Sequence, residues 1–131
     1  MFLADYNLTK GIPGAPVAHV KLSVDPVQKI VTGTATITQA TPQQYDPMEV
    51  TGTYFEQQHV GLVITVNSTQ PVIPGTPEFS SLIVIKNWGE AGQGWFWYFM
   101  GKTAYESGLV PATPVEAAVA TPVGATVAAK V

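Results

Sequence analysis

The amino-acid sequence predicts an all-β protein, an antiparallel barrel or sandwich of six to eight strands with a flexible C-terminal tail. Three observations lead to this prediction. Several segments alternate apolar and polar residues with a period of two, as half-buried strands do. Segments rich in Pro, Gly and Asn separate them at short intervals. No segment has the pattern of a convincing helix, so the strands must pack on one another.

The first two predicted strands show the alternation clearly. Residues 1–16, with a turn at Pro13-Gly14, are expected to be a segment that leads into a strand at Val17–Val24, in which apolar and polar residues alternate. After a turn at Asp25-Pro26, a strand at about Lys29–Gln39 carries threonine at every second position of residues 32–38. Threonine forms strands well and its hydroxyl binds water, so we expect this outer face to be solvated.

The next two strands contain a repeated motif. Met48–Glu56 includes Val50-Thr51-Gly52-Thr53, which repeats Val31-Thr32-Gly33-Thr34 of the preceding strand. The flanking residues do not match, so this is a strand motif and not a repeat unit. Both glycines fall on the predicted inner face, where glycine often marks a bend or the close approach of another group. Val60–Val66 is the fourth strand.

Two longer loops and the last strands complete the domain. We expect loops at residues 40–47 and 67–79, and the second has the length of loops that are often functional. Leu82–Asn87 is a fifth strand that is apolar on both faces. The sixth strand covers about Trp95–Gly101, and a short edge strand near Thr103–Glu106 follows.

The sixth strand is unusual because it has large apolar side chains on both faces. One face, expected in the core, carries Trp95, Trp97 and Phe99. The other face, which then needs a cover, carries Phe96, Tyr98 and Met100. The cover is the domain itself, a second subunit, the tail or a ligand. The predicted ligand or partner contacts are Trp88, Phe96, Tyr98, Met100 and Tyr54.

The chain is expected to form one domain over residues 1–107. Residues 111–131 are almost entirely Ala, Val, Pro, Thr and Gly, so residues 108–131 are expected to be a disordered tail. This tail is more apolar than ordinary disordered segments, and docking on the aromatic strand is the alternative.

Composition excludes several classes of function. With 131 residues, 46% of them hydrophobic, the chain can build a core. Only 11% of residues are charged, which suggests a protein that hides surface in an assembly or is modestly soluble. The net charge is −3 and there is no arginine, so we expect no nucleic-acid partner. Without cysteine there are no disulfides or thiolate sites. No cofactor is predicted.

Candidate catalytic groups are few. His19 and His59 are the only histidines, and we expect two unrelated surface residues and no metal pair. No pattern brings two carboxylates together around one bond. The Gly-x-x-Gly-x-Gly run at residues 89–94 lacks the strand-to-helix setting of a phosphate loop, so it is read as a hairpin turn. We therefore predict no catalytic and no metal site.

The N-terminal sequence bears on location. It lacks the basic start of a signal peptide, and Asp5 interrupts the short apolar stretch. No apolar run approaches the about 20 residues of a transmembrane helix. A cytoplasmic protein is expected, and export without a classical signal stays open.

Three short motifs resemble those of one uncharacterised family of small bacterial β-proteins. They are Ile12-Pro13-Gly14-Ala15-Pro16, Val31-Thr32-Gly33 and Ile37-Thr38-Gln39-Ala40. The resemblance covers about residues 10–45, and it implies an all-β fold and no known activity. Val50–Tyr54 also resembles a strand of biotin-binding barrels, although the rest of that pattern is missing.

Three hypotheses about function result. The first is a non-enzymatic protein whose aromatic strand contacts a homo-oligomer or another protein. The second is a barrel that binds an apolar molecule inside, where Gly33 and Gly52 would leave room. The third is an enzyme that positions a substrate with Tyr54, His59 or Glu90.

Overall fold

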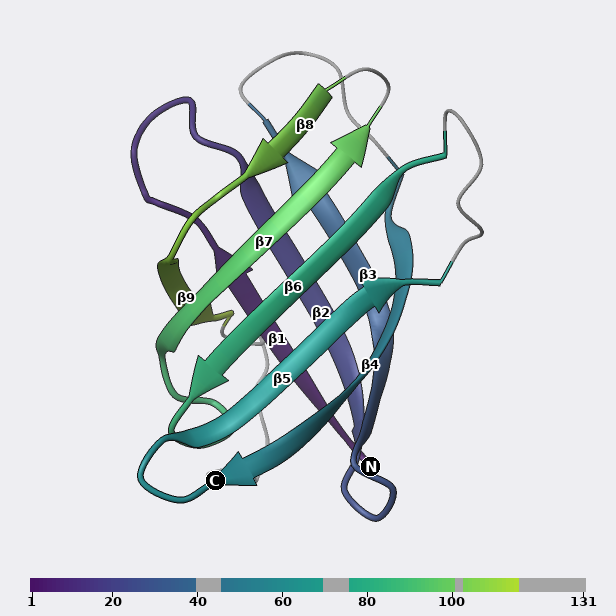
Figure 1. The fold of residues 1–131 in the computed structure, drawn as a ribbon, viewed down its shortest axis with the longest axis vertical. Helices are drawn as coiled ribbons and strands as arrows, with labels where there is room; N and C mark the ends of the chain where they lie inside the picture. The colour runs from purple at the N-terminus through teal and green to yellow at the C-terminus, as the bar shows by residue number, and fades with distance from the viewer. Residues whose placement is uncertain (40–45, 70–75, 101–102, 116–131) are drawn as a thin grey trace.

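The structure, a computed structural model, describes residues 1–39, 46–69, 76–100 and 103–115, which form nine β-strands and no helix (Figure 1). The strands are β1 (Phe2–Leu8), β2 (Val17–Asp25), β3 (Ile30–Thr38), β4 (Met48–Gln57), β5 (Gly61–Ser68), β6 (Glu78–Ile85), β7 (Gly92–Met100), β8 (Thr103–Glu106) and β9 (Val110–Pro114). Each pair of neighbours is antiparallel. The predicted all-β antiparallel fold is confirmed.

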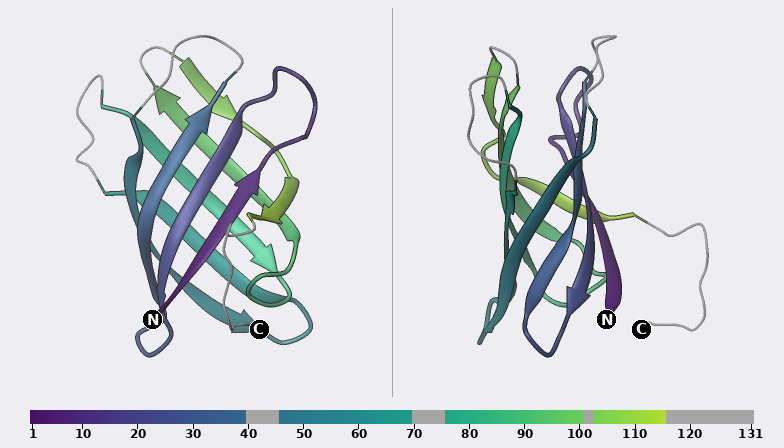
Figure 2. Two further views of the ribbon diagram at one scale, coloured as in Figure 1. Left: turned by 180° about the vertical axis from the view of Figure 1, so that it is seen from behind. Right: turned by 90° about the vertical axis from the view of Figure 1, so that its right-hand side faces the viewer.

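Eight of these strands close into a barrel. The strands β1 to β7 follow one another as a meander, and β9 then pairs with both β7 and β1. In side view, β9 crosses from the layer that contains β7 to the layer that contains β1 (Figure 2). In the described part of the chain β8 is an extra strand, which pairs with β7. The sequence left barrel and sandwich open as alternatives, and the structure is a barrel.

One edge of β7 pairs with β8 over residues 97–100 and with β9 over residues 92–94. Ser107 lies between these two partner strands. The Ser107 N–H donates to the Phe96 carbonyl over 2.9 Å, and the Phe96 N–H donates to the Ser107 hydroxyl over 2.9 Å. That hydroxyl in turn donates to the Gly108 carbonyl. Gly108 has a φ of 67°, which glycine adopts without strain. The backbone of Phe96 thus stays paired where the two strands part.

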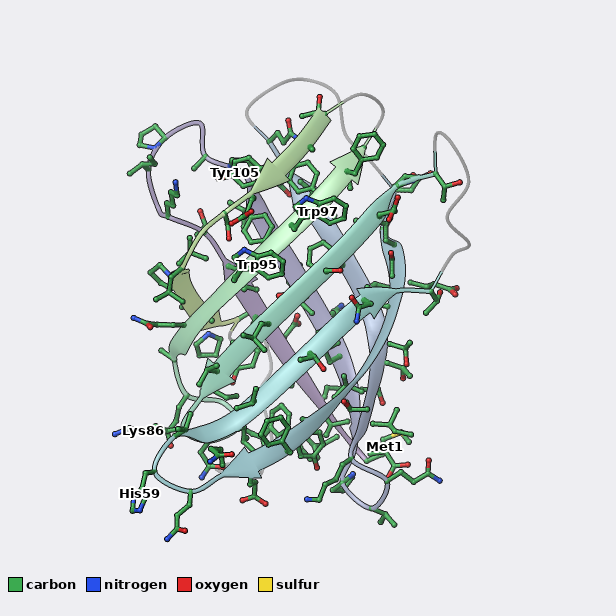
Figure 3. The ribbon with its side chains drawn as sticks, viewed as in Figure 1. Met1, His59, Lys86, Trp95, Trp97 and Tyr105 are labelled. Atoms are coloured by element: carbon green, nitrogen blue, oxygen red, sulfur yellow. The ribbon has the colours of Figure 1, made fainter. Side chains whose placement is uncertain are left out.

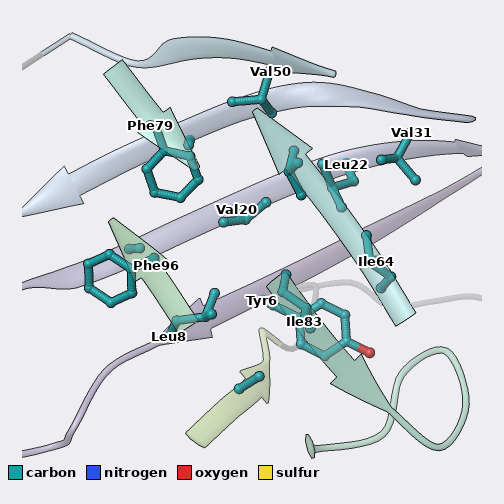
Figure 4. Close-up of a cluster of buried hydrophobic side chains, with 14 of the residues drawn as sticks. Tyr6, Leu8, Val20, Leu22, Val31, Val50, Ile64, Phe79, Ile83 and Phe96 are labelled. Carbon is teal, nitrogen blue, oxygen red and sulfur yellow. The ribbon is translucent and has the colours of Figure 1, made fainter. Parts of the chain in front are cut away.

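The barrel interior is the hydrophobic core. Side chains that point inward alternate with outward ones along each strand, and every barrel strand contributes buried residues (Figure 4). Among the largest that are fully buried are Tyr6, Leu8, Leu22, Ile64, Phe79, Ile83 and Phe96. In the described residues, every buried side-chain nitrogen or oxygen has a hydrogen-bond partner. The interior therefore carries little unpaired polarity.

The two glycines of the repeated motif allow neighbouring strands to approach closely. A Cβ added at Gly33 would lie 1.9 Å from the Lys21 carbonyl oxygen, and one at Gly52 would lie 1.7 Å from that of Thr65. The predicted close approach is confirmed. The idea that these glycines leave room for a ligand is wrong, because the backbone of the adjacent strand occupies the space.

Several boundaries differ from the sequence prediction. Strand β1 was expected only as a segment that leads into the first strand, and β6 begins at Glu78, four residues before the predicted Leu82. Strand β9 lies within the predicted tail, so the predicted domain end at residue 107 is too early. Its Ala112 is 0% exposed, which makes β9 part of the core. Residues 40–45 and 70–75 of the predicted loops, and residues 116–131 of the predicted tail, lie outside the described residues.

Candidate functional site

The two faces of β7 are the reverse of the prediction. Phe96, Tyr98 and Met100 are 1–2% exposed inside the barrel, whereas Trp95, Trp97 and Phe99 lie outside and are half-buried. Gly94 shares the inner face, where an added Cβ would lie 2.4 Å from Leu8 Cδ2. The interior of an eight-stranded barrel is narrow, so the face with the glycine fits inside and the face with two tryptophans does not.

The inner aromatic residues stack on one another. Phe96 lies parallel to both Phe79 and Tyr98, with ring centroids 6.4 and 6.3 Å apart. Tyr105 of β8 packs on Tyr98 at 5.4 Å, and the Tyr98 hydroxyl accepts a hydrogen bond from the Gln39 amide over 2.8 Å. The cover of this face is therefore the barrel itself. The prediction that Phe96, Tyr98 and Met100 contact an external partner is wrong, because these side chains are buried. Their contact with a molecule inside the barrel stays a prediction.

Trp88 and Tyr54 belong to a second aromatic group, separate from the stack. The Trp88 ring lies edge-on to Phe2 at 5.3 Å and to Tyr54 at 5.1 Å. The Lys29 Nζ lies 5.4 Å from the centre of the Tyr54 ring. Trp88 comes from the β6–β7 connection, so these contacts attach that connection to the strands β1 and β4. No ring contact in the described part of the chain joins this group to the stack around Tyr98.

The Tyr6 hydroxyl fixes the same connection from inside. It accepts the Gly89 N–H over 3.0 Å and donates to the Glu90 carbonyl over 3.2 Å. Burial raises the pKa of Tyr6; the hydrogen bond from Gly89 opposes this rise and the Glu90 carboxylate adds to it. Burial also raises the pKa of Tyr54, with smaller contributions from Glu56 and Asp25. Both hydroxyls stay protonated at neutral pH, and that of Tyr6 serves as a hydrogen-bonding group.

The two histidines lie in different parts of the barrel. The His19 Nε2 is 2.6 Å from the Asp5 Oδ1 on the outside of β1 and β2. His59 lies in the β4–β5 turn with a φ of 72°, and no contact in the described part of the chain joins it to His19. No group of three His, Asp or Glu side chains among the described residues could hold a metal ion. The Asp5–His19 pair was missed because residues 1–16 were not read as a strand.

The outside of β4 to β7 carries a group of apolar side chains, with Thr65, Ser80 and Gln93 between them, which we call the outer aromatic face. It consists of Phe55, Val63, Leu82, Val84, Trp95, Trp97 and Phe99. Adjacent strands bring these together, since Trp95 lies opposite Leu82, and Val84 lies opposite Val63. Figure 3 shows Trp95 and Trp97 in line along β7. Phe55 and Leu82 are 49% and 37% exposed, so this surface meets solvent in the single chain.

The opposite side of the barrel is polar. The outward positions of β3 are Thr32, Thr34, Thr36 and Thr38, and none is buried. The predicted solvated threonine face is thus confirmed. The two outer sides of one barrel differ in chemistry, and only the outer aromatic face has the aromatic side chains typical of an interface core.

The described residues include no helix that is long and apolar enough to cross a membrane. A search of the curated proteins finds no match to this chain. A family model described as a domain of unknown function, DUF1842, matches residues 1–103, which include β1 to β7. This range covers most of the chain, in agreement with the resemblance to an uncharacterised family of β-proteins. The chain belongs to the DUF1842 family.

Proposed function

We propose that this protein is a non-enzymatic binding module whose outer aromatic face contacts another protein chain. The observation that carries the proposal is the placement of Trp95, Trp97 and Phe99 on the outside of β7, next to the exposed Leu82. The barrel is closed and the inner residues form its hydrophobic core, so its fold does not require large aromatic side chains here. Exposed clusters of large apolar side chains often mark interaction sites.

The chemistry of the face supports a protein partner. Trp and other aromatic residues dominate the energetics of interfaces, and a central one commonly contributes about 2 kcal/mol or more to binding. The low charge content of the chain, 11%, also favours a protein that covers part of its surface in an assembly. The cytoplasm stays the expected compartment.

Site-specific photocrosslinking in cells that naturally produce the protein tests this proposal. A photoreactive phenylalanine analogue is placed at Phe99 on the outer aromatic face, and at Thr36 on the polar side as the matched control. We expect a covalent protein adduct from position 99 and not from position 36. Equal yields from both positions, or no adduct from position 99 in a folded variant, would contradict the proposal.

A further inference from the structure

The outer aromatic face has opposite charges at its two ends. Glu78 begins β6, and Lys86 follows its last residue, so both lie on the outward-facing positions of one strand. Glu106 of β8 lies opposite Trp97, at the Glu78 end. Figure 3 places Lys86 at the other end of β6. At about 3.3 Å per residue, Glu78 and Lys86 are about 26 Å apart, with Leu82 midway.

These end charges are available for an external contact. The ion pairs in the described part of the chain are His19–Asp5 and Lys29–Glu56, and neither involves the face. Glu90, in the same connection as Lys86, lies near the Tyr6 hydroxyl at the barrel end and not on the face. Glu78 and Glu106 therefore lie at one end of the face and Lys86 at the other, with Ser80, Leu82 and Val84 between them on the outward positions of β6.

We propose that the occupant of the outer aromatic face is a second copy of this chain, docked face to face about a twofold axis that runs across the strands near Leu82 and Trp95. This inference rests on the proposed function. Such an axis reverses the strand direction between the copies, so the Glu78 end of one chain meets the Lys86 end of the other. Symmetry makes this contact twice. A twofold axis along the strands would instead place carboxylate on carboxylate, which opposes association.

The size of the face sets the expected affinity. Four strands, β4 to β7, spaced about 4.8 Å apart and about 26 Å long, give a footprint of roughly 500 Å². Stable interfaces bury about 800 Å² of accessible surface on each partner. The footprint is smaller than that, so we expect a weak dimer, with a dissociation constant in the micromolar range, on the order of 1–100 μM.

Sedimentation equilibrium of the full chain from low micromolar to millimolar concentration tests the inference by charge reversal. Glu78→Lys and Lys86→Glu should each weaken the dimer about tenfold, because each creates two like-charge contacts by symmetry. The double variant E78K/K86E should restore the dissociation constant to within about threefold of the wild type. Lys21→Glu, on the opposite side of the barrel, is the matched control and should leave it unchanged. All three positions lie at the surface, and far-ultraviolet circular dichroism checks that each variant folds.

The outcomes separate the inference from the proposed function. If the chain is a monomer throughout the concentration range and the position-99 adduct does not have twice the chain mass, the dimer is overturned. The proposed function as a binding module is then still supported. A dimer that both single reversals leave unchanged, or that the double variant fails to restore, overturns the proposed orientation. A position-99 adduct of twice the chain mass, together with restoration by E78K/K86E, supports both. A monomer that also gives no adduct overturns both.

Discussion

Gly33 and Val50 lie directly opposite each other in the β3–β4 ladder, and the same register places Gly52 opposite Val31. The two copies of the Val-Thr-Gly-Thr motif therefore pair with each other in antiparallel fashion. Each valine fills the interior beside a glycine of the other strand. Each glycine in turn admits the backbone of its outer neighbour, β2 or β5. The repeated motif is thus one structural device for a tightly coiled pair of strands.

Replacing these glycines should destabilise the barrel strongly. Gly33→Ala or Gly52→Ala places a Cβ within 2 Å of a backbone carbonyl oxygen, so a neighbouring strand must move. We expect the free energy of unfolding, measured by urea denaturation, to fall by about 3 kcal/mol or more. Gly11→Ala is the control: Gly11 has a φ of 77° and open space around it, so its cost should be only about 1 kcal/mol. Equal costs at positions 11 and 33 would contradict the close approach.

Strand β9 should be essential to the fold, in contrast to a disordered tail. Ala112→Glu puts a carboxylate into the barrel interior at a fully buried position, and the protein should unfold or lose several kcal/mol, roughly 3–5, of stability. Thr113→Glu places the same group on the exposed side of the same strand and should change stability by less than about 0.5 kcal/mol. Circular dichroism with thermal unfolding compares the two. Similar stability of both variants would show that β9 does not close the barrel.

Removal of the Tyr6 hydroxyl should loosen the β6–β7 connection. Tyr6→Phe leaves the Gly89 N–H and the Glu90 carbonyl without their partner, so we expect a loss of about 1–2 kcal/mol and faster hydrogen exchange at the Gly89 amide. Tyr105→Phe is the control, since the Tyr105 hydroxyl makes no hydrogen bond within the part of the chain that the structure describes. Unchanged exchange at Gly89 in Tyr6→Phe would exclude the hydroxyl as the anchor.

Stability should fall at alkaline pH through Tyr6. Burial raises its pKa in the folded protein above the ordinary value of 10.0. Below that pH the hydroxyl is protonated in both states, and the contribution of Tyr6 is complete. As the pH rises through the raised pKa, the unfolded chain loses the proton more readily, so folding weakens. Urea denaturation across this range should show a steeper loss for the wild type than for Tyr6→Phe; parallel curves would argue against this linkage.

The sequence predicted those parts of the fold whose strands have one polar face. The alternation around Val20 and the threonine row of β3 determine both the strands and their outward faces. Strand β9 was missed because its two prolines and small residues resemble a tail, while its place between β7 and β1 depends on contacts distant in the sequence. Strand β1 was also missed, and its pairing with β9 likewise depends on a contact distant in the sequence.

The candidate site was predicted only in part, because β7 is apolar on both faces and its alternation alone cannot assign the inside. The signal that could have decided it is Gly94, which shares its face with Phe96 and Tyr98. Tryptophan is also too large to be fully buried often. Trp95, Trp97 and Phe99 lie outside the barrel, so they replace Phe96, Tyr98 and Met100 as the residues for which a cover is predicted.

The late position of β9 in the chain also determines how the protein can be made. During synthesis the meander from β1 to β7 emerges first, and each new strand can pair at once with the one before it. Strands β1 and β7 each keep one unpaired edge until residues 110–114 leave the ribosome and pair with both of them. Closure thus depends on a contact of long sequence separation, and a nascent chain released before β9 is made would present two edges able to pair with other chains.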